Sequence, residues 1–119
     1  MTFPSDHMNS RAKGAAGERE WRDQLRAAGY TARRGQQFSG GTDSPDVVCE
    51  ELGQVLHFEV KRVERLNLEV AMDQARKDGA GKVPVVAHRR NNCPWLVTIP
   101  AEAFFSILKD GLEGLGKKE

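Results

Sequence analysis

The sequence predicts an α/β fold, in which a mixed β-sheet is flanked by helices. The chain has 119 residues, a length that suits one domain. Hydrophobic residues make up 39% of it, enough to build a modest core. Apolar residues recur with helical spacing in some segments and alternate with polar residues in others. These segments follow the order helix, three strands, helix, two strands, helix.

The first helix is predicted over residues 14–28, and Gly29 follows it as a left-handed C-terminal cap. The inward stripe of this helix comprises Glu18, Trp21, Leu25 and Ala28. Glu18 is the one acid on that stripe, and a buried carboxylate is costly unless it has a partner. An acid near a helix start is also favoured by the helix dipole. The sequence leaves both interpretations open.

Three strands are predicted next, over residues 30–38, 45–49 and 54–61, with a loop at 39–44 and a turn at 51–53. The third strand alternates, with Leu56, Phe58 and Val60 on one face and Val55, His57, Glu59 and Lys61 on the other. Glu59 and Lys61 therefore share a face. His57 is expected to be a partly exposed residue of that face, and metal ligation or DNA contact is its alternative role.

The second half of the chain is predicted to contain a helix over residues 66–79, strands over 83–87 and 95–99, and a last helix from Pro100. The apolar residues of the last helix are expected to be mostly core, with room for a dimer seam: Phe104, Phe105, Ile107 and Leu108. Residues 1–13 are expected to form a flexible lead and 111–119 a flexible tail. The single domain then spans residues 14–110.

Composition excludes several classes of protein. No run of about 18 apolar residues exists, so no membrane-spanning helix is predicted. The N-terminus lacks the basic-then-apolar pattern of a secretory signal, which predicts a cytoplasmic location. Two cysteines, Cys49 and Cys93, are too few for a disulfide scaffold or a cysteine zinc site.

The net charge of +1 hides an uneven distribution. Residues 10–34 carry seven basic side chains against three acids, and residues 76–90 carry five against one. Residues 42–60 between them hold five acids and no Lys or Arg. The charge pattern is therefore a basic rim around an acidic centre, and a divalent cation at that centre would offset two of its negative charges.

The acidic centre has a spacing that suits metal-assisted hydrolysis. Asp46 begins one strand and Glu59 and Lys61 end the next, so two neighbouring antiparallel strands can bring them together. Converging carboxylates repel unless a cation sits between them, and oxygen ligands are those that Mg²⁺ prefers. Lys61 can stabilise charge on a phosphodiester transition state or orient the attacking water. Glu18 can add a third acid through water or on a second metal.

At these residues the chain resembles the PD-(D/E)xK nuclease superfamily, and within it the archaeal-type Holliday junction resolvases and their small phage relatives. The resemblance runs from about residue 9 to residue 108. The matching segments are 13–20 (KGAAGERE), 39–40 (SG), 45–48 (PDVV), 58–61 (FEVK), Gln74, 88–91 (HRRN) and 95–100 (WLVTIP). The resemblance implies a restriction-endonuclease-like αβββαβ core with a C-terminal strand and helix.

The resemblance also implies the roles of individual residues. Glu18, Asp46, Glu59 and Lys61 would be the catalytic set, with Asp46, Glu59 and the Val60 carbonyl as ligands of Mg²⁺, for which Mn²⁺ could substitute. Members of this branch act as homodimers on branched DNA, each subunit nicking one strand. The residues expected to contact DNA are Lys13, Arg33, Arg34, Ser39, Arg62, Arg65, Gln74, Arg89 and Arg90.

The sequence therefore predicts a Mg²⁺-dependent DNA endonuclease that resolves Holliday junctions, encoded by a bacterial, archaeal or phage genome. One alternative is a nuclease of the same superfamily that cuts duplex, flap or single-stranded DNA. Another is a DNA-binding module of the same fold without catalysis, against which the presence of all four candidate catalytic residues argues.

Overall fold

The computed structural model describes residues 10–35 and 45–111. Its elements are α1 (Ser10–Ala27), β1 (Ala32–Arg34), β2 (Val47–Cys49), β3 (Leu56–Arg62), α2 (Leu68–Gly79), β4 (Val83–Arg89), β5 (Leu96–Thr98) and α3 (Ala101–Asp110). This order confirms the predicted α/β fold, an αβββαβ core followed by a strand and a helix. Among the helices of the described segments, none is long and apolar enough to cross a membrane.

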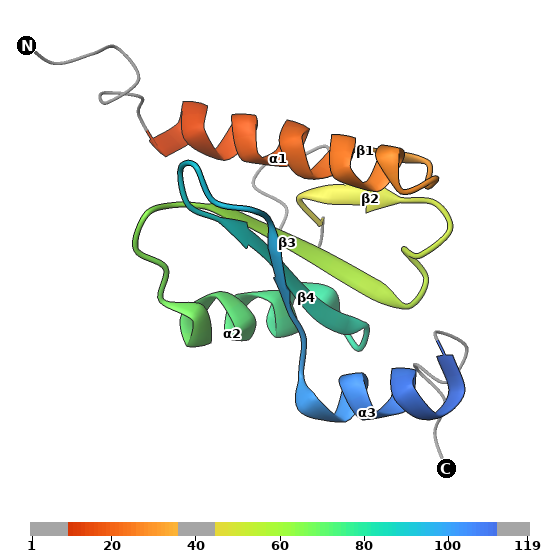
Figure 1. Cartoon of the computed structure of the whole chain (residues 1–119). Helices are drawn as coiled ribbons and strands as arrows, with labels where there is room; N and C mark the ends of the chain where they lie inside the picture. The colour runs from red at the N-terminus through yellow and green to blue at the C-terminus, as the bar shows by residue number, and fades with distance from the viewer. Residues whose placement is uncertain (1–9, 36–44, 112–119) are drawn as a thin grey trace, which may run out of the picture.

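The five strands form one mixed sheet in the order β1-β2-β3-β4-β5. All neighbours are antiparallel except β3 and β4, which are parallel and are joined through α2. Figure 1 shows α1 along one face of the sheet and α2 against the other. β3 is therefore the central strand, and it is paired on both sides and covered on both faces.

The core has two parts, one on each face of the sheet. On the α1 face, Trp21 stacks near Phe58 and Trp95, with ring centroids 5.9 and 5.3 Å apart, respectively. On the α2 face, Met72 and Ala75 pack against Val86 of β4. Because both faces are covered, strands β3 and β4 are buried on both sides rather than alternating between core and solvent.

This double coverage makes the prediction for His57 wrong. Its side chain is 2% exposed, not partly exposed as its alternating strand position suggested. The last turn of α2 lies on the ring, since a Cβ atom built at Gly79 would come within 3.1 Å of the His57 Cβ atom. Gly79 was predicted only as a helix end, and it also lets α2 approach the sheet closely.

The ends of α1 differ from the prediction. It begins at Ser10, so residues 10–13 of the expected flexible lead are helical, since these residues carry no helix breaker. It ends at Ala27, which leaves Ala28 exposed rather than on the buried stripe. Gly29 has a φ of 100° and is the left-handed residue predicted there.

Several other predictions fall partly or wholly outside the described residues. Of the strand predicted over 30–38, residues 32–34 form β1, and 36–38 are outside the description. The same holds for the loop at 39–44, which contains Ser39, for residues 1–9 and for residues 112–119. The remaining strands and helices match their predicted segments within about two residues.

The prediction that the apolar face of the last helix is mostly core is wrong. Phe104, Phe105 and Leu108 of α3 are exposed, and Ala103 is the buried residue of this helix. Figure 1 shows why, because α3 lies at one end of the molecule, apart from the faces that α1 and α2 cover. The spacing of apolar residues predicted an apolar face on this helix, but it could not predict whether another element packs against that face.

The contact between α1 and β3 requires a glycine at position 17. A Cβ atom built at Gly17 would lie 2.8 Å from the Arg62 Cβ atom, closer than carbon atoms approach in proteins. Because this Arg62 atom is next to the backbone, the side chain cannot swing away from it. Gly14, one turn earlier in the same helix, has no atom within 4 Å of such a position.

We therefore expect opposite effects from alanine at these two glycines. Gly14→Ala should raise the free energy of unfolding by about 0.5–1 kcal/mol, since alanine favours a helix. Gly17→Ala should lower it by about 1–3 kcal/mol, because α1 must move away from β3. Urea unfolding of both variants measures the difference, and equal stabilisation by the two would contradict the close contact.

Candidate active site

A cleft of about 760 Å³ opens where α1, the end of β3 and α2 meet. Its lining residues are Lys13, Gly14, Glu18, Asp46, Glu59, Val60, Lys61, Arg62, Val63, Glu64, Gln74 and Asp78. All four residues predicted to be catalytic are among them. The structure thus brings together side chains that lie up to 43 positions apart, between Glu18 and Lys61 in the sequence.

Asp46 is buried at the start of β2, where this strand meets β3. Its backbone N–H donates to the Phe58 carbonyl, with the two atoms 3.1 Å apart. Its carboxylate oxygen Oδ2 accepts a hydrogen bond from the Val60 N–H at 2.8 Å. The side chain therefore continues the β2–β3 ladder by one step, which fixes the carboxylate beside β3.

The Val60 backbone completes this arrangement. The N–H and C=O groups of one strand residue point to the same side of the strand. Because the Val60 N–H points to Asp46, its carbonyl also points toward the β2 side of β3, where the Asp46 carboxylate lies. This is the placement that a carbonyl ligand beside the two acids would need.

Glu59 is 7% exposed and lies in the same cleft. The pKa of Glu59 is raised to about 7, mainly by burial and also by the negative charge of Asp46, while Lys61 acts in the opposite direction. Lys61 alone does not offset the effect of burial and of Asp46 on Glu59, so a further positive charge beside the two carboxylates would stabilise their charged forms. The donor set, two carboxylates and one carbonyl, fits a hard divalent cation such as Mg²⁺.

Glu18 has the partner that its position on the inward stripe of α1 demands. Its Oε1 atom accepts hydrogen bonds from the Arg34 Nε atom at 3.1 Å and the Arg34 Nη2 atom at 2.9 Å. The Glu18 side chain is 18% exposed, and that of Arg34 41%. Arg34 was predicted to hold DNA phosphate, and the structure places it at the edge of the cleft, paired with this acid.

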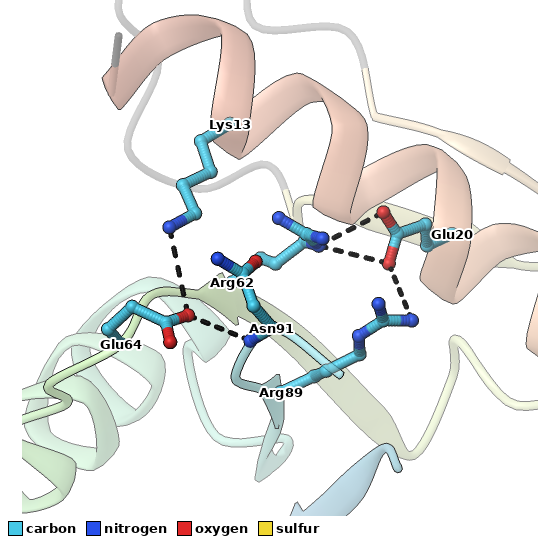
Figure 2. Close-up of polar contacts among 6 residues, drawn as sticks. All are labelled: Lys13, Glu20, Arg62, Glu64, Arg89 and Asn91. Atoms are coloured by element: carbon cyan, nitrogen blue, oxygen red, sulfur yellow. Dashed lines mark hydrogen bonds and ion pairs between the residues drawn. The ribbon is translucent and has the colours of Figure 1, made fainter. Parts of the chain in front are cut away.

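Three more of the predicted DNA-contacting residues form ion pairs with acids that the sequence did not single out (Figure 2). Glu20 contacts both Arg62, at 3.0 Å, and Arg89, at 3.2 Å. Glu64 contacts the Lys13 ammonium at 3.8 Å and accepts a hydrogen bond from the Asn91 N–H at 2.7 Å. These contacts connect α1, β3 and the loop after β4 around one side of the cleft.

The remaining predicted DNA contacts are placed differently. Arg33, Arg65 and Arg90 are exposed. Gln74 lines the cleft from α2, where its Nε2 atom donates to the Asp78 Oδ2 atom at 2.8 Å. Ser39 lies outside the described residues.

Asp78 is a cleft residue that the sequence analysis missed. Its carboxylate groups with His57 and Glu59, and one ligand atom from each of the three lies within 4.8 Å of the others. The signal for Asp78 was its place four residues after Gln74, which puts both on one helix face. Nothing in the sequence alone indicated that the last turn of α2 lies over His57.

Comparison with known proteins gives two matches. The model of the family described as archaeal Holliday junction resolvase (Hjc) matches residues 9–103. Among solved structures, the chain is similar to Hjc of Archaeoglobus fulgidus, a Holliday junction resolvase from an archaeal hyperthermophile. The two share 28% sequence identity over 73% of this chain and 72% of that one, with a TM-score of 0.53. No curated protein sequence matches the chain.

The raised pKa of Glu59 predicts how stability changes with pH in metal-free protein. The folded state holds this proton up to a pH of about 7, whereas the ordinary value is 4.5. The folded state therefore binds more protons over this range, and the free energy of unfolding falls as the pH rises through it. Below pH 4.5 and above a pH of about 7, Glu59 no longer changes the free energy of unfolding as the pH changes.

Urea unfolding in EDTA at a series of pH values measures this slope. Glu59→Gln has no proton to lose, so its stability should exceed that of the wild type increasingly as the pH rises from about 4.5 to about 7. Parallel pH profiles for the two proteins would show that Glu59 titrates normally.

Proposed function

Because the chain belongs to the archaeal Holliday junction resolvase family, we propose that it hydrolyses phosphodiester bonds of four-way DNA junctions with Mg²⁺. The observation that carries this proposal is the convergence of the buried acids Asp46 and Glu59 with Lys61 and Glu18 in one cleft. Two acids on adjacent strands can hold a divalent cation, and a lysine two residues after the second can stabilise charge on a scissile phosphate. Mn²⁺ is expected to substitute for Mg²⁺.

Each residue of the proposed site has a distinct task. Asp46, Glu59 and the Val60 carbonyl would hold the cation, which when bound polarises the scissile phosphate and makes its coordinated water more acidic. Lys61 stabilises the negative charge that develops on the phosphate oxygens. Glu18, held by Arg34, supplies the acid at the α1 wall of the cleft.

The charges around the cleft support binding of the DNA backbone. Arg62 and Arg89 share the single carboxylate of Glu20, so this triad keeps one net positive charge. Arg33 and Arg90 are exposed, and neither forms an ion pair with an acid among the described residues, so both can contact phosphates directly. Contacts of this kind hold the backbone without reading sequence, as an enzyme selective for DNA shape requires.

We expect Asp46→Asn to lower the rate of junction cleavage with Mg²⁺ by at least about 100-fold, since it removes the charge that holds the cation. Asp73→Asn is the matched control, because Asp73 is an exposed acid of α2 that does not line the cleft. The assay follows nicking of a labelled four-way junction, with flap and linear duplex of the same sequence beside it. Full cleavage by Asp46→Asn would refute the site, and equal cleavage of all three substrates would refute the preference for junctions.

We propose further that the protein acts as a homodimer through α3 and the edge strand β5. Phe104, Phe105 and Leu108 of α3 are exposed, and so are Leu96 and Val97 of β5. These five side chains belong to consecutive elements at the C-terminal end of the fold. Exposed apolar side chains that gather into a patch commonly mark a protein interface, and a second copy would place a second active site on the same junction.

Phe105→Asp should convert the dimer into a monomer, because a carboxylate would be buried in the apolar interface. Val70→Asp makes the same kind of change at an exposed apolar residue of α2 and should leave the dimer intact. Sedimentation velocity distinguishes the two states. A monomeric wild-type protein, or dissociation by both variants alike, would contradict this interface.

A further inference from the structure

We propose that His57, Glu59 and Asp78 form a second cation site, suited to a transition-metal ion such as Zn²⁺. The site shares Glu59 with the set proposed to hold Mg²⁺. Its occupancy therefore opposes cleavage, and this consequence, unlike the binding itself, rests on the proposed function.

The geometry of the three side chains supports a common ligand. One ligand atom from each lies within 4.8 Å of the others. Zinc bonds to nitrogen and oxygen are about 2.0–2.2 Å long and the sites are tetrahedral, so the three ligand atoms of one ion lie about 3.4 Å from one another. A decrease of up to about 1.4 Å in these separations, which rotation of the two carboxylates can supply, would complete the site.

His57 supplies the independent reason to expect a ligand here. Its side chain is 2% exposed, and its Nε2 atom is buried without a hydrogen-bond partner among the described residues. Buried polar atoms are rarely left in this state, and each instance calls for an explanation. The last turn of α2 holds the ring in place, since Gly79 lies against it, and the same turn brings in Asp78.

The ligand types select the class of ion. The His57 imidazole offers a nitrogen ligand beside the carboxylates of Glu59 and Asp78. One imidazole with two carboxylates suits Zn²⁺, Mn²⁺ or Fe²⁺, whereas Mg²⁺ prefers oxygen ligands alone. The oxygen-only set of Asp46, Glu59 and Val60 and the mixed set with His57 should therefore differ in their preferred metals.

Sharing of Glu59 couples the two sites. A Zn²⁺ ion at His57 and Asp78 draws the Glu59 carboxylate toward α2. Asp46 then loses the second acid of the set proposed to hold Mg²⁺. Zn²⁺ should accordingly inhibit Mg²⁺-dependent cleavage by binding beside the Mg²⁺ site and weakening it, rather than by occupying that site.

Calorimetric titration of Zn²⁺ into the metal-free full-length protein tests the site without DNA. We expect Asp78→Asn to weaken Zn²⁺ binding by at least about tenfold, as loss of a ligand should. The matched control Asp73→Asn, on the same helix, should bind Zn²⁺ like the wild type. Asp46→Asn should also retain Zn²⁺ binding, because Asp46 does not belong to this site.

His57→Gln is a second variant of the proposed site. Because His57 is buried, circular dichroism is used to check that this variant folds. In NMR spectra of the three histidines of the chain, Zn²⁺ should shift the ring signals of His57. Wild-type affinity in Asp78→Asn, or loss of Zn²⁺ binding in Asp46→Asn, would overturn the proposal. In the second case Zn²⁺ would occupy the set proposed for Mg²⁺.

The effect on cleavage is measured with the four-way junction at a fixed Mg²⁺ concentration. The Zn²⁺ concentration that halves the rate should rise at least about tenfold in Asp78→Asn, relative to its own rate without Zn²⁺. Unchanged inhibition in this variant would overturn the coupling through Glu59. If the chain cleaves no junction, the calorimetric titration still decides whether the site exists.

Discussion

Asp46 and Glu59 lie in one cleft because β2 and β3 are neighbouring antiparallel strands, and the Asp46 carboxylate is fixed by the Val60 N–H. Two buried acids so placed repel each other, and burial together with the negative charge of Asp46 raises the pKa of Glu59. Other groups of the site are placed where they, or a cation that they help to bind, can offset this repulsion. Lys61 lies on the same strand face as Glu59, the Val60 carbonyl points to the same side as Asp46, and a divalent cation between the acids would remove the conflict.

Interactions between α1 and the sheet hold the walls of this cleft. Gly17 allows α1 to contact β3 at Arg62, the residue that follows Lys61. Glu20 then contacts both Arg62 and Arg89, as Figure 2 shows. Glu18, two residues earlier in α1, is paired with Arg34. Several acids and bases that cancel in the net charge are therefore structural partners, and the exposed Arg33 and Arg90 are among the residues proposed to contact DNA.

Local patterns predicted the element order, the mixed sheet and the four candidate catalytic residues that line the cleft. They failed where the outcome depended on a contact between distant segments. His57 alternates like a surface residue, and only the position of α2 makes it buried. Phe105 has the spacing of a core residue, but no other element of the described chain covers it. Asp78 became visible as a site residue only when the crossover from β3 to β4 placed its helix turn over the sheet.

The central claim is that Asp46 and Glu59 together hold a divalent cation. The most direct test is a crystal of the protein soaked in Mn²⁺, measured at a wavelength where manganese scatters anomalously. The account predicts an anomalous peak at bonding distance, about 2.2 Å, from carboxylate oxygens of both Asp46 and Glu59. Density for ordered Asp46 and Glu59 carboxylates with no manganese bound to Asp46, at saturating Mn²⁺, would contradict it.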